Sequence, residues 1–230
     1  VYLAGIFIIL LLFTVVFLLR KDLRKILIYT GFLLALSGPI SEILFFRDYW
    51  NPPAIFEFNL LGLRILVEDV LFAFAAPVLG AYVYFILFNR KLDKKFSNSK
   101  QYIIRFNLVS IPFIILFFFI TLAFGINSIF SVMLTSIIMS TFVLWRRKDL
   151  LRVYLKTSIL AALGVFVFYY LYIAIIGENY LLSVWLLDHE IFGFRFLSTI
   201  VPITEVLFAA TVMPCILLFT LFASELRVGK

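Results

Sequence analysis

Seven long apolar segments dominate this 230-residue chain and decide what it can fold into. A helix needs about 20 mostly apolar residues to cross the hydrocarbon core of a bilayer. Hydrophobic residues make up 64% of the chain and charged residues 14%, against about 45–50% and about 25% in soluble domains. We therefore expect an all-α, polytopic membrane protein, which excludes a soluble enzyme and a nucleic-acid-binding domain. The predicted transmembrane helices cover roughly residues 3–19, 26–46, 62–88, 103–123, 126–145, 155–176 and 196–224.

The basic residues favour one orientation of these seven helices. With the N-terminus outside, 17 of the 20 Lys and Arg residues fall in segments on the inner side, and only Arg47, Arg64 and Arg195 fall outside. Cytoplasmic loops of membrane proteins carry an excess of Lys and Arg. We predict a multi-pass protein of the cell membrane with its N-terminus outside and its C-terminus inside.

Two motifs recur along the chain and predict an internal repeat. R-K-D-L at residues 20–23 returns at 147–150, and D-V-L-F-A at 69–73 returns as E-V-L-F-A at 205–209. The first three spans and the last three spans then form two copies that cross the membrane in the same direction, with the fourth span between them. This parallel 3+1+3 arrangement predicts a first repeat over residues 1–95, a linker helix over 96–124 and a second repeat over 125–230.

Acidic residues within or at the ends of the predicted spans are the main candidates for chemistry. Glu68 and Asp69 lie about seven residues into the third span and Glu205 about nine residues into the seventh, a depth of roughly 10–13 Å. An acid in mid-membrane costs about 2.5–3.5 kcal/mol. We interpret these residues, with Glu42 and Glu178 near the outer ends of the second and sixth spans, as a buried carboxyl cluster. The alternative is that protonated acids join the helices by bonding to Arg64, Arg195, Thr204 or the backbone.

Four further residues lie near these acids and are predicted to contact a substrate. Phe72 and Phe208 each follow a repeated acid by three residues, almost one helical turn, so their rings can stabilise a cation on the same face. Trp50 fits an interfacial belt. Pro202, six residues into the last predicted span, either loosens the helix near Glu205 or simply kinks it.

The sequence contains little that points to a metal or a cofactor. It has one cysteine, Cys215, and one histidine, His189, and it contains no dinucleotide fingerprint. We predict no metal, no cofactor and no nucleic-acid partner.

Three stretches carry a resemblance to a known family. They are D-Y-W-N-P at residues 48–52, L-R-I-L-V-E-D-V-L-F at 63–72 and P-I-T-E-V-L-F at 202–208. Together they resemble the repeated domain of the heterodimeric-type lycopene cyclases, a family that includes fused archaeal and fungal forms. Its mark is a Pro-x-Glu-Glu/Asp motif before an apolar Leu-Phe pair, once in each half. Here the first copy lacks the proline and the second lacks the first acid, so Asp69 and Glu205 match the second acidic position and Glu68 alone matches the first.

The resemblance implies a redox-neutral cyclisation of a linear carotenoid end group, as in lycopene. An acid protonates a terminal double bond, a neighbouring double bond attacks the cation, and a base removes a ring proton. A buried carboxylic acid can donate the proton, and a carboxylate can shield the cation and accept the proton. The predicted catalytic residues are therefore Glu42, Glu68, Asp69, Glu178 and Glu205, and the carotenoid reaches them from the lipid.

Two other functions remain open at this stage. Sugar transporters of the SWEET type also use parallel 3+1+3 repeats, but their polar lining should reach both sides of the membrane. In this chain the polar groups of the spans gather in the outer leaflet. A non-catalytic membrane subunit is the second alternative, if the acids only bind one another.

Overall fold

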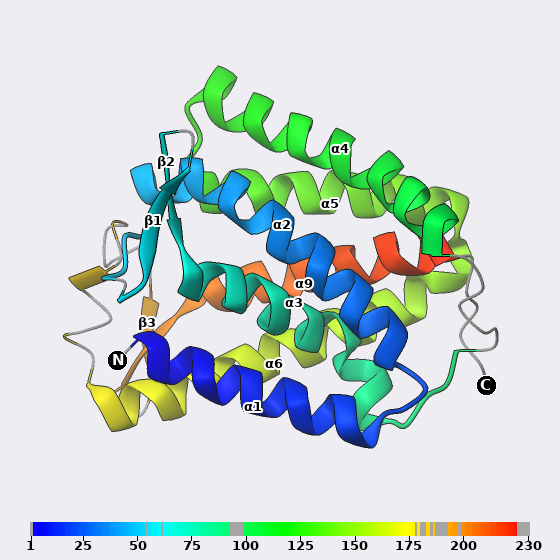
Figure 1. Cartoon of the computed structure of the whole chain (residues 1–230), viewed down its shortest axis with the longest axis horizontal. Helices are drawn as coiled ribbons and strands as arrows, with labels where there is room; N and C mark the ends of the chain where they lie inside the picture. Colours follow the sequence, from blue (N-terminus) through cyan, green and yellow to red (C-terminus); the bar gives the residue numbers. More distant parts are fainter. Residues whose placement is uncertain are drawn as a thin grey trace.

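The computed structural model describes residues 2–53, 55–60, 62–92, 99–177, 179, 183–184, 186, 193–196 and 199–224. The chain is mostly helical, and its helices form one bundle (Figure 1). The helices are α1 (Tyr2–Leu19), α2 (Arg24–Asp48), α3 (Val67–Leu87), α4 (Ser99–Phe124), α5 (Ser128–Arg146), the short 3-10 helix η1 (Lys148–Leu150), α6 (Leu151–Ile176) and α9 (Ile203–Ser224). Two hairpins complete the described fold, formed by β1 (Glu57–Leu60) with β2 (Leu63–Leu66) and by β3 (Gly193–Phe196) with β4 (Thr199–Pro202).

The long helices match the seven apolar segments of the sequence. Among the described residues, six helices are long and apolar enough to cross a membrane, namely α1, α3, α4, α5, α6 and α9. The seventh, α2, is bent by 49° between its halves Arg24–Leu36 and Gly38–Asp48. Pro39 lies beside this bend, and a proline inside a helix removes one backbone hydrogen bond and crowds the preceding turn.

The two hairpins correct the all-α prediction and the starts of two spans. The third span begins as a helix at Val67 and not at residue 62, and the seventh begins at Ile203 and not at residue 196. The second strand of each hairpin, L-R-I-L in β2 and T-I-V-P in β4, is mostly apolar and runs directly into the helix that follows, so composition alone does not separate strand from helix. Pro202 is accordingly the last residue of β4, where its missing amide hydrogen costs nothing, and it does not interrupt a helix.

The two hairpins have the same register at a constant separation. Glu57 pairs with Leu66 in the first hairpin, and Gly193 pairs with Pro202 in the second, each 136 residues later. A long helix follows each hairpin directly, α3 after the first and α9 after the second. Figure 1 shows both hairpins at the same end of the bundle, close to the start of α1.

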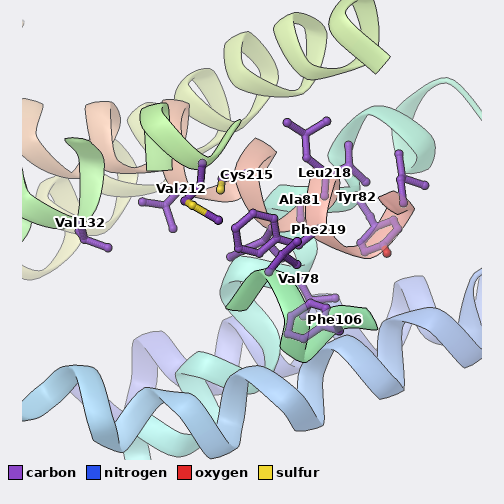
Figure 2. Close-up of a cluster of buried hydrophobic side chains, with 14 of the residues drawn as sticks. Val78, Ala81, Tyr82, Phe106, Val132, Val212, Cys215, Leu218 and Phe219 are labelled. Atoms are coloured by element: carbon purple, nitrogen blue, oxygen red, sulfur yellow. The ribbon is translucent and has the colours of Figure 1, made fainter. Parts of the chain in front are cut away.

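Helices α3 and α9 pack against each other at the centre of the bundle. Helices α1 and α2 cover α3, whereas α4, α5 and α6 cover α9. Gly80 permits the central crossing, because a Cβ at this position would lie 1.9 Å from the Sδ of Met213. Figure 2 shows the packed interior beside it, where Phe219 of α9 lies against Phe106 of α4 among buried aliphatic side chains.

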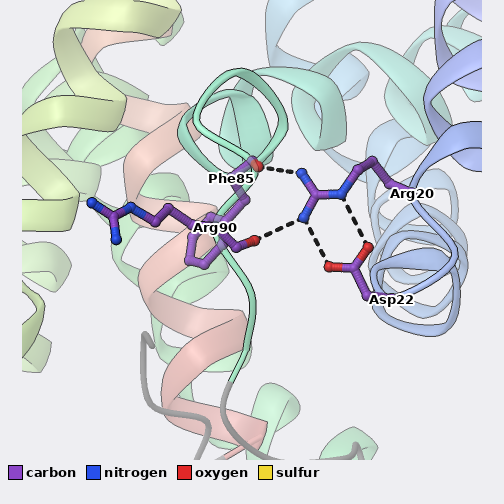
Figure 3. Close-up of polar contacts among 4 residues, drawn as sticks. All are labelled: Arg20, Asp22, Phe85 and Arg90. Atoms are coloured by element: carbon purple, nitrogen blue, oxygen red, sulfur yellow. Dashed lines mark hydrogen bonds and ion pairs between the residues drawn. The ribbon is translucent and has the colours of Figure 1, made fainter. Parts of the chain in front are cut away.

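The R-K-D-L motif closes the C-terminal end of α3 (Figure 3). Arg20 is only 9% exposed, and its guanidinium donates to the carbonyl oxygens of Phe85 and Arg90, the latter at 2.7 Å. It also pairs with Asp22 at 2.8 and 3.0 Å. The last carbonyls of a helix lack partners within the helix, and a cation is favourable there. Hydrogen bonds from Arg20 lower the pKa of the Asp22 carboxyl below its ordinary value.

The second copy of the motif repeats part of this arrangement. Arg147 pairs with Asp149 at 2.8 and 2.9 Å through the same two guanidinium nitrogens that Arg20 uses toward Asp22. In both copies the Arg and the Asp two residues later form a bidentate pair at the turn between two helices.

Candidate functional site

A cavity of about 120 Å³ lies at the hairpin end of the bundle, between α1, α2, α3, α6 and α9. Most of its wall is aliphatic or aromatic, and it includes the side chains of Phe72 and Phe208. Two carboxyl groups, from Glu42 and Glu205, belong to its polar lining. The other polar groups are the indole nitrogen of Trp50 and the hydroxyl groups of Tyr2, Tyr49, Tyr169 and Tyr172.

Glu205 is the third residue of α9 and reaches the cavity from the first turn of that helix. Tyr49, at the end of α2, donates a hydrogen bond from its hydroxyl group to the Oε1 atom of Glu205. The N-terminus of a helix also carries a partial positive charge, which favours a negative charge in the first turn. Glu205 is therefore held by a donor from another helix in a place that suits a carboxylate.

Glu42 contributes the second carboxyl group from α2. The indole nitrogen of Trp50 donates to its Oε2 atom at 3.3 Å, and the Trp50 ring meets the Tyr2 ring edge to face, with 5.1 Å between centroids. Glu42 lies within electrostatic range of a third carboxyl group, that of Asp69. The cavity wall therefore has one carboxyl group from α9 and one from α2, and Asp69 of α3 lies near the second of these.

Asp69 approaches the cavity but does not line it. Its Oδ1 atom accepts a hydrogen bond from the Tyr2 hydroxyl, and it is the ring of Tyr2 that forms the wall. The other oxygen, Oδ2, is buried and makes no hydrogen bond to any described residue. Asp69 thus interacts with the cavity through Tyr2 and through its proximity to Glu42.

Glu68 makes its contacts away from the cavity. Its Oε1 atom accepts hydrogen bonds from the backbone amides of Ile55 and Phe56 at 2.8 and 3.1 Å, which ties the start of the first hairpin to α3. Successive helix residues project 100° apart, so Glu68 and its neighbour Asp69 face different surroundings. Glu68 is not among the residues that line the cavity.

The structure corrects the position of these acids along their helices. Glu68 and Asp69 are the second and third residues of α3, and Glu205 is the third residue of α9, so all three lie in a first helical turn. This places them about 2–5 Å along their helices, and not 10–13 Å. The difference arises because β2 and β4 occupy the residues predicted as the first turns of these helices.

The remaining predicted residues fall in different places. Trp50, Phe72 and Phe208 line the cavity, whereas Pro202 is buried and does not line it. Glu178 lies outside the described residues. Arg64, one proposed partner of the span acids, instead bonds to Glu57 at 2.7–2.8 Å and to Asn51 at 2.8 Å.

Sequence reasoning missed Tyr2 and the tyrosines of α6 at this site. Tyr2 and the aromatic run F-Y-Y-L-Y at residues 168–172 supply much of the wall, through Phe168, Tyr169 and Tyr172. Phe168, Tyr169 and Tyr172 are one, three and four residues apart, so their rings lie along one face of α6. This cluster of aromatic residues could have indicated from the sequence that this face of α6 lines a site. In the part of the chain that the structure describes, no three His, Cys, Asp or Glu side chains come together as metal ligands. Comparisons with protein-family models, curated proteins and solved structures found no match for this chain.

Proposed function

We propose that this chain is an integral-membrane carotenoid cyclase, which converts a linear end group of lycopene or a related polyene into a ring without a cofactor. The observation that carries the proposal is the placement of Glu42 and Glu205 on the wall of a single apolar, aromatic cavity. Proton transfer to and from a hydrocarbon requires an acid and a base that reach the same apolar space.

The two sides of the cavity suit opposite steps of the reaction. We assign the proton donor to Glu42, which lines the cavity from α2 and has a second carboxyl group, that of Asp69, nearby. We assign the proton acceptor to Glu205, whose carboxylate is stabilised by Tyr49 and by the N-terminus of α9.

In the proposed cycle, the Glu42 carboxyl proton adds to the terminal double bond of the end group and leaves a tertiary cation. The electrons of a neighbouring double bond close the six-membered ring, and the positive charge moves onto a ring carbon. Glu205 then removes a proton from the adjacent ring carbon, which restores a double bond. The rings of Phe72 and Phe208 line the same cavity and present π faces that stabilise a cation. The polyene gains and loses one proton, so its composition is unchanged. Glu42 is left ionised and Glu205 protonated, and proton exchange with water restores both before the next turnover.

The same proposal includes the 3+1+3 repeat, with the N-terminus outside and the C-terminus inside the cell membrane. Three observations support it: the hairpins share a register at a separation of 136 residues, α3 and α9 each carry an acid in the third helical position, and the Arg–Asp pair recurs. The Lys and Arg residues at the α1–α2 and α5–α6 turns, away from the hairpins (Figure 1), support the orientation.

A small-solute transporter of the SWEET type is the competing function. Its polar lining should continue beyond the outer half of the bundle. The hydroxyl groups of Tyr82 and Thr220 in the other half are fully buried and bond to each other at 2.8 Å, so they belong to the packed core. This pairing favours the cyclase.

The test is expression in a bacterium that accumulates lycopene, followed by chromatography of the pigments. The intact chain should yield new cyclic carotenoids, and Glu205→Gln and Glu42→Gln should each lose them at equal membrane levels. Glu57→Gln, which changes an exposed hairpin acid, is the matched control and should retain them. Unchanged lycopene with the intact chain would overturn the proposal, and solute uptake into proteoliposomes would then support the transporter.

A further inference from the structure

The cavity extends away from the acids along α1. Its lining on this helix begins at Tyr2 beside Asp69 and continues through Ile6 to Ile9, a distance of about 10 Å along the axis. Phe168 of α6 lines the same space, and none of the side chains at Ile6, Ile9 and Phe168 carries a polar atom. A polyene whose end group binds beside Glu42 and Glu205 would therefore extend the rest of its chain along these apolar residues.

The extension lies where α1 and α6 meet, and this junction is loosely packed. Helix α1 packs mainly on α3, and α6 packs mainly on α9. We call the junction the α1–α6 seam and define it by Gly5, Ile6 and Ile9 on α1 and by Phe168 and Tyr172 on α6. The cavity as a whole is partly open to the surroundings, and few contacts between α1 and α6 hold this part of its wall together.

Gly5 and Tyr172 form the narrow point of the seam. A Cβ at Gly5 would lie 3.2 Å from Cε2 of the Tyr172 ring, so a side chain larger than hydrogen would press on that ring. Leu12 follows Gly5 by seven residues and so lies on the same side of α1, where it is 50% exposed. Gly5, Ile6 and Ile9 are themselves buried, so the seam lies inside the bundle directly beneath exposed side chains such as Leu12.

We propose that the α1–α6 seam is the doorway through which one end of a long polyene chain enters the cavity from the lipid, with the rest of the chain left between α1 and α6. This inference rests on the proposed cyclase function, because the acids at the end of the cavity define which part of the chain must enter.

The test measures polyene binding separately from ring formation. Glu205→Gln, purified from lycopene-making cells, should retain bound lycopene, measured as visible absorbance per protein. Adding Gly5→Phe should lower the bound pigment at least tenfold. Adding Gly164→Phe is the matched control, because a Cβ at Gly164 on α6 meets no atom within 4 Å, and bound pigment should stay unchanged.

A further variant separates blocking from misfolding. Tyr172→Ala should restore pigment binding to the Gly5→Phe protein, since it removes the ring on which the new side chain presses. Pigment binding that is unaffected by Gly5→Phe, or absent from the Glu205→Gln parent, would overturn the doorway. If the intact chain forms rings that Gly5→Phe does not reduce, the doorway fails and the cyclase stands. If Gly5-dependent pigment binding occurs without any ring products, the cyclase fails and the doorway stands.

Discussion

The hydroxyl group of Tyr49 donates a hydrogen bond to the carboxylate of Glu205, which lies 156 residues later in the chain. Asp48, the residue before Tyr49, accepts hydrogen bonds from the amide and the hydroxyl group of Ser128 at 2.9 and 2.5 Å and so caps the start of α5. Two consecutive residues at the end of α2 therefore position both a helix and an acid of the second half of the chain.

Replacing Tyr49 by Phe removes this donor and keeps the ring. We expect ring formation to slow about tenfold, because a hydrogen bond to a charged group contributes roughly 1.5 kcal/mol and each 1.4 kcal/mol is a factor of ten in rate. The loss should appear in kcat and not in KM, measured with lycopene in membranes. Tyr84→Phe is the control, because Tyr84 is a buried ring near the end of α3 that lies away from the hairpins. Equal turnover in both variants would show that Tyr49 does not act on Glu205.

Glu68 should prove to be a structural residue, contrary to its predicted catalytic role. Glu68→Ala leaves the amides of Ile55 and Phe56 without their acceptor, and we expect the free energy of unfolding to fall by about 1–3 kcal/mol. Glu68→Gln retains an acceptor oxygen and should keep most of the stability and the ring formation. Thermal unfolding of the purified protein in detergent, with pigment analysis, measures both. Loss of rings in a stable Glu68→Gln protein would restore the catalytic assignment.

The Arg20–Asp22 pair should make stability depend on pH in the acid range. The pKa of Asp22 is lower in the folded chain than in the unfolded chain, where it is about 3.9. The pair therefore stabilises the fold above about pH 4, and this contribution disappears as the pH falls through the lower, folded pKa. The Tm in detergent should drop on acidification from pH 5 to pH 3, and the drop should be smaller in Asp22→Asn. An identical acid drop in that variant would contradict the linkage.

Gly80→Ala should destabilise the central crossing of α3 and α9. The new methyl group would overlap Met213, and overpacking of a close helix contact costs about 1–3 kcal/mol. Met213→Ala removes the overlapping atoms, so the double variant should be more stable than the sum of the two single changes indicates. Unfolding measurements on the four proteins give this coupling energy, and strictly additive effects would show that Gly80 is not needed for close packing.

The sequence predicts the helices of this fold well, because length and apolar composition are local properties. The segment predicted at residues 103–123 is α4 (Ser99–Phe124), and that predicted at 126–145 is α5 (Ser128–Arg146). The hairpins escaped prediction because their second strands, β2 and β4, are mostly apolar and continue without a break into α3 and α9. In the first hairpin, Gly62 with φ of +80° lies between the strands, and a glycine at this point was a local sign of a turn.

The site was predictable where the repeat pointed to it and not where distant segments meet. Phe72, Phe208 and Glu205 were found through the repeated motif, and all three line the cavity. The contact of Tyr2 with Asp69 joins residues 67 positions apart, and no local pattern announces it. Such pairings decide which of two adjacent acids lies next to the cavity. The order of Glu68 and Asp69 in the chain therefore could not show that Asp69 is the one that contacts Tyr2.

The acids of α3 and α9 occupy the first turns of their helices, directly after the hairpins. In the proposed cyclase they lie close to the aqueous boundary on the hairpin side and need no proton relay through the bilayer. Their protonation would then follow the pH of the compartment outside that face, and a polyene ring closed in heavy water supplied only from that side would carry deuterium.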